Sequence, residues 1–140
     1  MKANVPVSTI MTKNVIKLNL GDDLTKAETL FKMNHIRHIP VVSGNKILGM
    51  LSYTDLLRIS FADAVDEEEI EVDVTVYNMF TIEQVMTRNL VTISPDSSIK
   101  EVAEILAVKE FHALPVVQDE LLVGIVTTTD LIKYLLKQYN

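Results

Sequence analysis

The chain has 140 residues, of which 48% are hydrophobic and 23% charged, and it carries no cysteine and a formal net charge of −6. This length suits one globular body, the lack of cysteine excludes disulfides, thiolate nucleophiles and cysteine-bound zinc, and the negative charge disfavours binding to a nucleic-acid backbone. No apolar run is long enough to span a membrane and no secretory signal is expected, so a cytoplasmic location is predicted.

The first half of the chain predicts a β-α-β-β-α order. An apolar lead-in at residues 7–11 precedes a predicted strand at 15–18. Asp22 or Asp23 can cap the helix that follows, which is predicted from residue 24 to about 34 by its apolar spacing. Strands are predicted at 39–42 and 47–52, joined by a turn at Ser43-Gly44-Asn45. A second helix is predicted from Thr54 to about residue 64.

An acidic segment at residues 66–69 follows, and we interpret it as a solvated linker. A divalent-cation site is the alternative, although the segment lacks the turn glycine that would bring its carboxylates onto one ion. Residues 74–79 are more apolar and are predicted to form a short helical turn.

The second half of the chain repeats the first at an offset of 75 residues, from Met11-Thr12 to Met86-Thr87. Residues 40–42 and 49–56 correspond to 115–117 and 124–131 without a gap, which indicates a duplicated unit. The second unit therefore predicts a strand at 91–93, a helix at 98–109, strands at 114–117 and 121–127, and a helix at 129–138. The predicted fold class is α/β (α+β), with a first repeat at residues 1–65, a linker and short turn at 66–81, and a second repeat at 82–140.

Each repeat places a hydroxyl and a carboxylate three residues apart where a strand turns into a helix, at Ser52 and Asp55 and again at Thr127 and Asp130. Unpaired N–H groups at a helix start can hold a phosphate, and a carboxylate can accept both hydroxyls of a ribose. The same spacing is a helix-capping signature. Capping and ligand binding are therefore both open, and they are compatible because a ligand can displace a cap.

These motifs resemble those of CBS domains, named after cystathionine β-synthase, and the tandem arrangement resembles a Bateman module. The resemblance rests on the Met-Thr lead-in, the Ile/Leu-Pro-Val-Val strand and the Gly-to-Asp-Leu motif, each present twice, and covers nearly the whole chain. It implies two repeats packed by their sheets about a pseudo-two-fold axis, with an adenosine-containing ligand in the cleft between them. AMP, ADP, ATP, S-adenosylmethionine and sometimes NAD are the ligands it implies. It also implies a regulatory rather than catalytic role, in a stand-alone protein of the bacterial or archaeal type.

The predicted ligand-binding residues lie at the strand ends and helix starts. They are Ser52, Thr54, Asp55, Thr127, Thr129 and Asp130 at the helix starts; Gly49 and Gly124, where the backbone could approach a ligand; Ile16, Lys17, Pro40, Thr92 and Pro115 around an adenine; and Arg37 and His38 for a phosphate. No catalytic or metal-binding residue is predicted.

The pair of residues before each aspartate departs from the family pattern, because many nucleotide-binding relatives carry Arg or Lys there. The pairs here are Tyr53-Thr54 and Thr128-Thr129. Arg37 and His38 are the nearest basic candidates in the first repeat, and their equivalents in the second are His112 and Ala113. We therefore expect the site at Asp55 to favour a charged phosphate more than the site at Asp130 does.

The second helix of each repeat is apolar over a wider arc than one packed face requires. The apolar positions are Leu56, Leu57, Ile59, Phe61, Ala64 and Val65 in one helix and Leu131, Ile132, Tyr134, Leu135, Leu136 and Tyr139 in the other. We expect a homodimer through these helices, with packing of the helices on each other within one chain as the alternative.

The predicted function is a non-catalytic regulatory module that binds an adenosine ligand and signals through dimer shape or an unknown protein partner. The alternative is a structural or protein-interaction module that binds no ligand. Neither function requires a cofactor, a nucleic acid or a membrane, and a role for magnesium is open.

Overall fold

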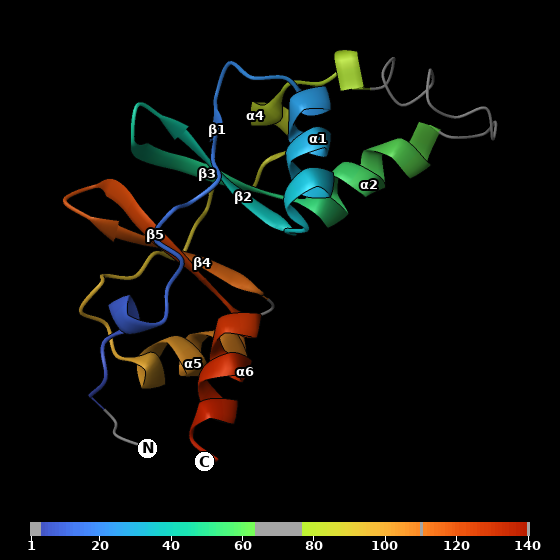
Figure 1. The fold of residues 1–140 in the computed structure, drawn as a ribbon. Coiled ribbons are helices and arrows are strands. Elements are labelled where there is room, and N and C mark those ends of the chain that lie inside the picture. Colours follow the sequence, from blue (N-terminus) through green and yellow to red (C-terminus); the bar gives the residue numbers. More distant parts are fainter. Residues whose placement is uncertain (1–3, 64–76, 110, 140) are drawn as a thin grey trace. The chain divides into compact units, whose positions relative to one another are not determined.

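The computed structural model describes residues 4–63, 77–109 and 111–139. The acidic residues 66–69, together with Ala64, Val65 and the first part of the turn predicted at 74–79, lie outside these ranges. The chain forms two compact units, one of residues Ile16–Leu90 and one that combines Met1–Val15 with Val91–Asn140. Figure 1 labels the helices and strands of both units.

The Ile16–Leu90 unit holds a sheet in the order β1-β2-β3, with β1 parallel to β2 and β2 antiparallel to β3. Helices α1 and α2 lie on the same side of these strands (Figure 1). The bounds of its elements are β1 Leu18–Asn19, α1 Leu24–Asn34, β2 His38–Ser43, β3 Lys46–Ser52, α2 Tyr53–Asp63 and α4 Ile82–Val85.

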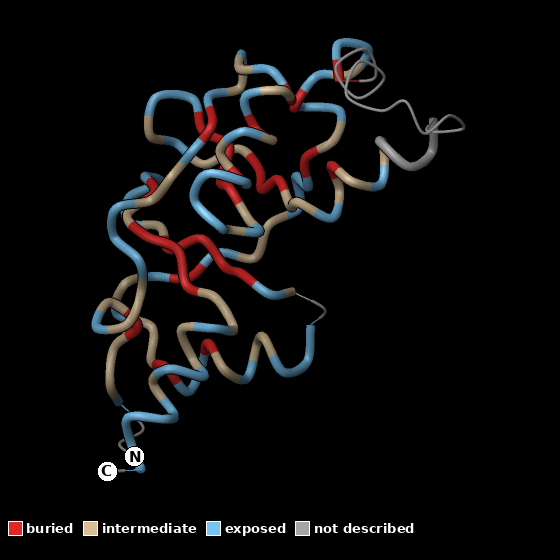
Figure 2. Tube along the Cα trace, turned by 45° about the vertical axis from the view of Figure 1, so that its right-hand side comes forward, coloured by how far each residue is buried: buried red, intermediate tan, exposed pale blue. Residues whose placement is uncertain are grey.

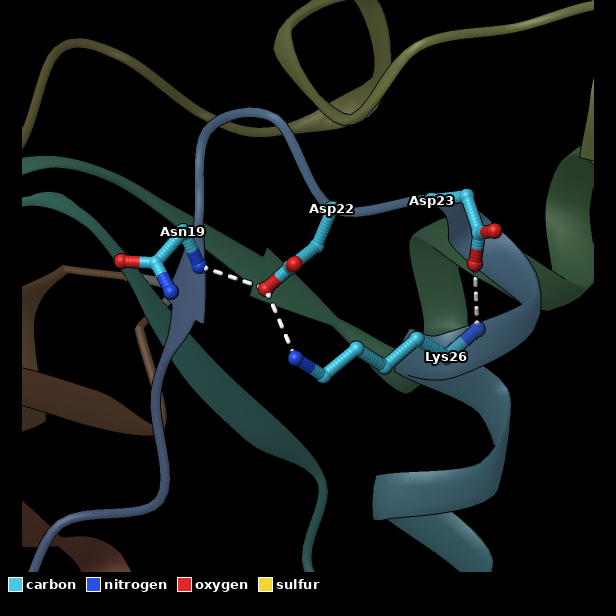
Figure 3. Close-up of polar contacts among 4 residues, drawn as sticks. All are labelled: Asn19, Asp22, Asp23 and Lys26. Atoms are coloured by element: carbon cyan, nitrogen blue, oxygen red, sulfur yellow. Dashed lines mark hydrogen bonds and ion pairs between the residues drawn. The ribbon is translucent and has the colours of Figure 1, made fainter.

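Two aspartates fix the start of α1 (Figure 3). The Asp23 side chain accepts a hydrogen bond from the Lys26 backbone N–H at 2.8 Å and caps the helix. Asp22 accepts from the Asn19 N–H at 2.8 Å and pairs with the Lys26 ammonium at 3.2 Å. The backbone hydrogen bond from Asn19, aided by Lys26, lowers the pKa of Asp22 below its ordinary value of 3.8.

The core of this unit joins the apolar faces of α1 and α2 to the strands. Phe31 packs beside Tyr53, with ring centroids 5.3 Å apart. Buried stretches follow the strands and the inner faces of the helices in Figure 2. The core side chains are Leu18, Leu24, Ala27, Phe31, Ile39, Val41, Leu51, Leu56, Tyr77, Ile82 and Met86.

The second unit is built around the antiparallel hairpin of β4 and β5. Its core consists of Val7, Ile93, Val102, Leu114, Val116 and Val126. Its elements are η1 Val7–Thr9, α5 Ile99–Val108, β4 Ala113–Gln118, β5 Leu121–Thr127 and α6 Thr128–Lys137. The mixed α/β fold class predicted from the sequence is confirmed, and no described helix is both long and apolar enough to cross a membrane.

The first strand of each repeat is shorter than predicted, and proline explains why. Leu18 begins β1 opposite Val41, and Ile93 forms only a single parallel bridge to Val116. Ile93 donates its N–H to the Pro115 carbonyl at 3.2 Å and accepts from Val117 at 2.8 Å. The next bond of such a ladder would need an N–H from Pro115, or from Pro40 in the other unit, and proline has none.

The apolar lead-in of each repeat packs within the unit that holds the other repeat's hairpin. Val7 is fully buried in the core beneath the β4–β5 hairpin, and Thr12 exchanges two backbone hydrogen bonds with Ile125 of β5, at 2.8 and 3.0 Å. In the Ile16–Leu90 unit, Thr87 exchanges the matching pair with Met50 of β3, at 3.0 and 2.9 Å. The lead-ins are thus exchanged between the repeats, which the repeat pattern did not predict. The repeat boundaries at residues 65 and 82 stay a prediction.

Candidate functional site

In the Ile16–Leu90 unit, the junction of β3 and α2 gathers a hydroxyl, a carboxylate and basic residues. The Ser52 hydroxyl accepts a hydrogen bond from the Asp55 N–H at 3.0 Å. The Asp55 carboxylate pairs with the Arg58 guanidinium at 3.2 Å, and the Arg58 side chain is 72% exposed. The exposed Arg37 lies beside the helix start, because its carbonyl accepts from the Tyr53 N–H at 2.8 Å.

The equivalent junction of β5 and α6 forms a closed capping box. The Asp130 carboxylate accepts from the N–H and the hydroxyl of Thr127, at 2.9 and 3.1 Å, and the Asp130 N–H donates to the Thr127 hydroxyl at 3.2 Å. The N–H of Thr128 donates to the His112 carbonyl at 3.0 Å. The Asp130 carboxylate is therefore held by Thr127, whereas the Asp55 carboxylate is held by Arg58.

Both junctions confirm that the hydroxyl residue caps its helix. Capping satisfies one N–H of each first turn and leaves other N–H groups at the helix start without an intrahelical partner. Thr54 and Thr129 are exposed in these first turns. Because the N–H groups of Tyr53 and Thr128 already donate to the carbonyls of Arg37 and His112, the N–H groups of residues 54 and 129 are the first-turn donors that could meet an anion.

The strand residues predicted around an adenine lie at the same end of each sheet as the junction. Ser52 pairs with His38, and Leu18 pairs with Val41, so the start of β2 has the end of β3 on one side and residues 16–17 on the other. Pro40 is buried between them. The matching register in the second unit brings three predicted residues to one end of its hairpin: the exposed Thr92, the buried Pro115 and Thr127.

The ammonium group of Lys17 does not reach the junction. It donates to the Asn45 side chain at 2.7 Å, and Asn45 lies in the hairpin turn, at the opposite end of β3 from Ser52. The charged group near Asp55 that sequence reasoning missed is Arg58. Its position three residues after Asp55 on a predicted helix was the available signal, because side chains at this spacing are neighbours.

Gly49 and Gly124 have a structural neighbour in the space where we expected a ligand. Gly49 faces Met86, and Gly124 faces Met11. The exchanged lead-ins thus occupy the side of each glycine where a Cβ atom would point, and a role for these glycines in ligand binding stays a prediction. Among the residues that the structure describes, no group of His, Asp or Glu side chains could hold a metal ion.

Comparison with known families identifies both repeats. The model of the CBS domain matches residues 7–62 and 82–137. Among curated proteins, the homoserine O-acetyltransferase of Methanococcus vannielii is 32% identical over 127 residues, which are 89% of this chain and 24% of that protein. The chain spans less than half the length of the first curated relatives it matches.

Solved structures share the fold over nearly the whole chain. The CBS domain of a CBS domain-containing membrane protein from Sphaerobacter thermophilus is 30% identical, with a TM-score of 0.79 over 94% of this chain and 88% of that one. The CBS domain pair of protein MJ0100, solved with 5′-methylthioadenosine and S-adenosyl-L-methionine, is 26% identical, with a TM-score of 0.77 over 94% of this chain and 99% of that one.

Proposed function

The chain belongs to the CBS domain family, and we propose on this premise that it is a non-catalytic regulatory module that binds an adenosine-containing ligand. The observation that carries the proposal is the paired hydroxyl and carboxylate at two equivalent helix starts, Ser52 with Asp55 and Thr127 with Asp130. The adenosyl ligands of the MJ0100 domain pair support the ligand class.

The chemistry of the junctions suits a nucleoside. The carboxylate can accept both ribose hydroxyls in charge-assisted bonds, and backbone N–H groups at the helix start can receive a phosphate without a basic side chain. The strand ends at Ile16 and Pro40, and at Thr92 and Pro115, are the places we propose for the base. Ligand binding would replace the contacts that now hold Asp55 and Asp130.

The two sites differ in charge, and we propose that the Asp55 site takes the more anionic ligand. Arg37, His38 and Arg58 accompany Asp55. At the same offset the second repeat has His112, Ala113 and Lys133. A guanidinium can bind a phosphate with two parallel hydrogen bonds, which favours AMP, ADP or ATP at the first site.

Thermal unfolding of the full chain tests the ligand class. We expect a rise in Tm with at least one of AMP, ADP, ATP, S-adenosylmethionine, 5′-methylthioadenosine or NAD, with GTP as the control, since a ligand at 100 times its Kd adds about 2.7 kcal/mol. The screen is run with and without magnesium. No shift with any compound would favour the alternative, a module that only binds other proteins.

Single-site variants test the ranking of the two sites. Asp55→Ala should abolish most of the AMP-induced shift, and Asp130→Ala should leave most of it. The reverse result would show that the ranking is wrong.

We also propose a homodimer through α6. Four large apolar residues of α6 and the turn after it are 41% to 78% exposed, and no residue of the helix is buried (Figure 2). They are Ile132, Leu135, Leu136 and Tyr139. A spacing of three and four residues places Ile132, Leu135 and Leu136 on one face of the helix, and Tyr139 follows in the turn. A second copy, which presents the same face, can cover them through a two-fold interface.

Sedimentation of Leu136→Asp tests this interface. We expect a dimer for the natural chain and a 15.7 kDa monomer for the variant. Lys133→Glu, on the same helix, should remain a dimer. A natural chain that sediments as a monomer at micromolar concentration would contradict the proposal. The regulatory signal would then pass to a partner protein rather than through a change in dimer shape. The absence of cysteine suits a cytoplasmic setting for a dimer and for a monomer with a partner.

A further inference from the structure

The segment at residues 86–93 connects two strands. It is bonded to β3, which ends at Ser52 beside Asp55, and to β4, which contains Pro115. Thr87 is bonded to Met50 of β3, two residues before Ser52. Five residues after Thr87 comes Thr92, and Ile93 is then bonded to Pro115 and Val117 of β4. One short segment is therefore anchored in both units, next to a predicted ligand residue in each.

The segment at residues 11–18 makes the reciprocal connection. Thr12 is bonded to Ile125 of β5, two residues before Thr127. Five residues after Thr12 comes Lys17, and Leu18 then pairs with Val41 of β2. The second connection repeats the first position for position, because both follow from the same exchange of lead-ins.

The anchors at the start of each connection are close-packed as well as hydrogen-bonded. A Cβ atom on Gly49 would lie 2.5 Å from Met86 Sδ, and one on Gly124 would lie 2.7 Å from Met11 Sδ. Arg88 is further held by Glu83 at 2.6 Å, and the Leu90 N–H donates to the Arg88 carbonyl at 2.9 Å. A movement of β3 at Met50 is therefore passed to Thr87, which is hydrogen-bonded to it, and to Met86, which packs against Gly49.

We propose that these two exchanged segments couple the two adenosine sites to each other. The inference rests on the proposed function. A ligand that shifts the end of β3 or β5 displaces the lead-in bonded to it, and the displaced segment carries residue 92 or 17 of the other site with it. Coupling of this kind is reciprocal, so each ligand changes the affinity of the other site by the same factor. Coupling can travel through packed and hydrogen-bonded residues, and each segment has such contacts at both of its ends.

Hydrogen exchange tests the coupling without a ligand. In Gly49→Ala, the added methyl group displaces Met86 and Thr87. We expect the amides of Ile93 and Val117 to exchange at least about five-fold faster relative to the amide of Val102 in α5 of the same unit. Gly21→Ala is the matched control, because nothing lies within 4 Å of its Cβ position, and it should leave this ratio unchanged. An unchanged ratio in Gly49→Ala would overturn the proposal. If Gly49→Ala does not fold, Met86→Ala takes its place, and the exchange rates of Ile93 and Val117 relative to Val102 are measured in that variant.

Ligand affinity then tests its consequence. Asp55→Asn disables the first site, so S-adenosylmethionine reports on the second site alone. Adding Gly49→Ala should weaken that affinity about five-fold or more, whereas adding Gly21→Ala should not change it. Unchanged affinity with intact binding in the natural chain would refute the coupling and leave the proposed function standing. No binding to the natural chain would refute the proposed function, and the exchange ratio would still judge the mechanical connection.

Discussion

Met86 packs its sulfur directly against Gly49: a Cβ atom on this glycine would lie 2.5 Å from Met86 Sδ and 2.9 Å from the Thr87 carbonyl oxygen. The equivalent pair, Met11 and Gly124, shows the same contact at 2.7 Å. Glycine stands at both positions because the backbone of a lead-in approaches the strand more closely than any side chain would permit.

Gly49→Ala should therefore destabilise the protein. Overpacking of this kind costs about 1 to 3 kcal/mol, and we expect the upper part of that range because one of the two closest atoms is a backbone oxygen. Urea unfolding measures the change. Gly21→Ala, with open space around its Cβ position, should stay within about 0.5 kcal/mol of the natural chain. Equal stability of the two variants would contradict the close packing.

Local chemistry in the sequence predicted the helices and hairpins well. Asp23 and Ser98 begin α1 and α5 as side-chain caps, and the Gly44 turn joins β2 to β3. Helix α4 was missed, although Thr81 and Gln84 form the capping box that its spacing spells out. The shortened first strands follow from Pro40 and Pro115, whose missing N–H groups end the ladder.

The exchange of lead-ins could not be predicted from the repeat. Both lead-ins carry Met-Thr, and both receiving strands carry a glycine, so the sequence does not distinguish which lead-in packs beside Gly49. For the candidate site, the pairing of hydroxyl and carboxylate was predictable from spacing. Spacing also offered Arg58 as a partner for Asp55 and Lys133 as a partner for Asp130, and the geometry was needed to show that Arg58 pairs with Asp55 whereas Thr127 holds Asp130.

Thr127→Ala should lower stability by about 1 kcal/mol, because it removes the side chain that closes the capping box with Asp130. Thermal and urea unfolding in the absence of ligand measure this loss. Thr127→Ser keeps the hydroxyl and should retain most of the stability. If Thr127→Ser loses as much stability as Thr127→Ala, the effect comes from packing of the threonine methyl group rather than from the cap.

Gly44→Ala should cost about 1 kcal/mol for a different reason. Gly44 has a φ of +63° with nothing within 4 Å of its Cβ position, so backbone strain is the only penalty. The equivalent turn residue in the second repeat is Asp119, with a φ of +53°. Asp119→Gly should relieve strain and raise stability by up to about 1 kcal/mol. If the urea midpoints of Gly44→Ala and Asp119→Gly shift in the same direction, backbone strain at positive φ does not explain both changes.

Tyr77→Phe should lower the free energy of unfolding by about 1 to 2 kcal/mol. The buried Tyr77 donates its hydroxyl to the Glu28 carboxylate at 2.5 Å, and Glu28 also pairs with Lys32 at 3.3 Å. Phenylalanine keeps the ring in the core and removes the hydroxyl that makes this bond. Lys32→Ala, which removes the exposed partner of the same carboxylate, should cost less than about 1 kcal/mol. A larger loss for Lys32→Ala than for Tyr77→Phe would reverse the assigned importance of the two contacts.

Asp22 should make stability depend on pH in the acid range. Its pKa is lowered in the folded protein, chiefly by the backbone hydrogen bond from Asn19, so the carboxylate contributes stability above its ordinary pKa of 3.8. That contribution is lost as the pH falls through the lowered value. Asp22→Asn should therefore destabilise the protein by about 1 kcal/mol or less at pH 7, and the difference from the natural chain should shrink below pH 3.8.

Asp96→Asn, at an exposed position, serves as the control and should stay within about 0.5 kcal/mol at pH 7. A difference between the natural chain and Asp22→Asn that grows on acidification would show that the charged form of Asp22 is not the stabilising one.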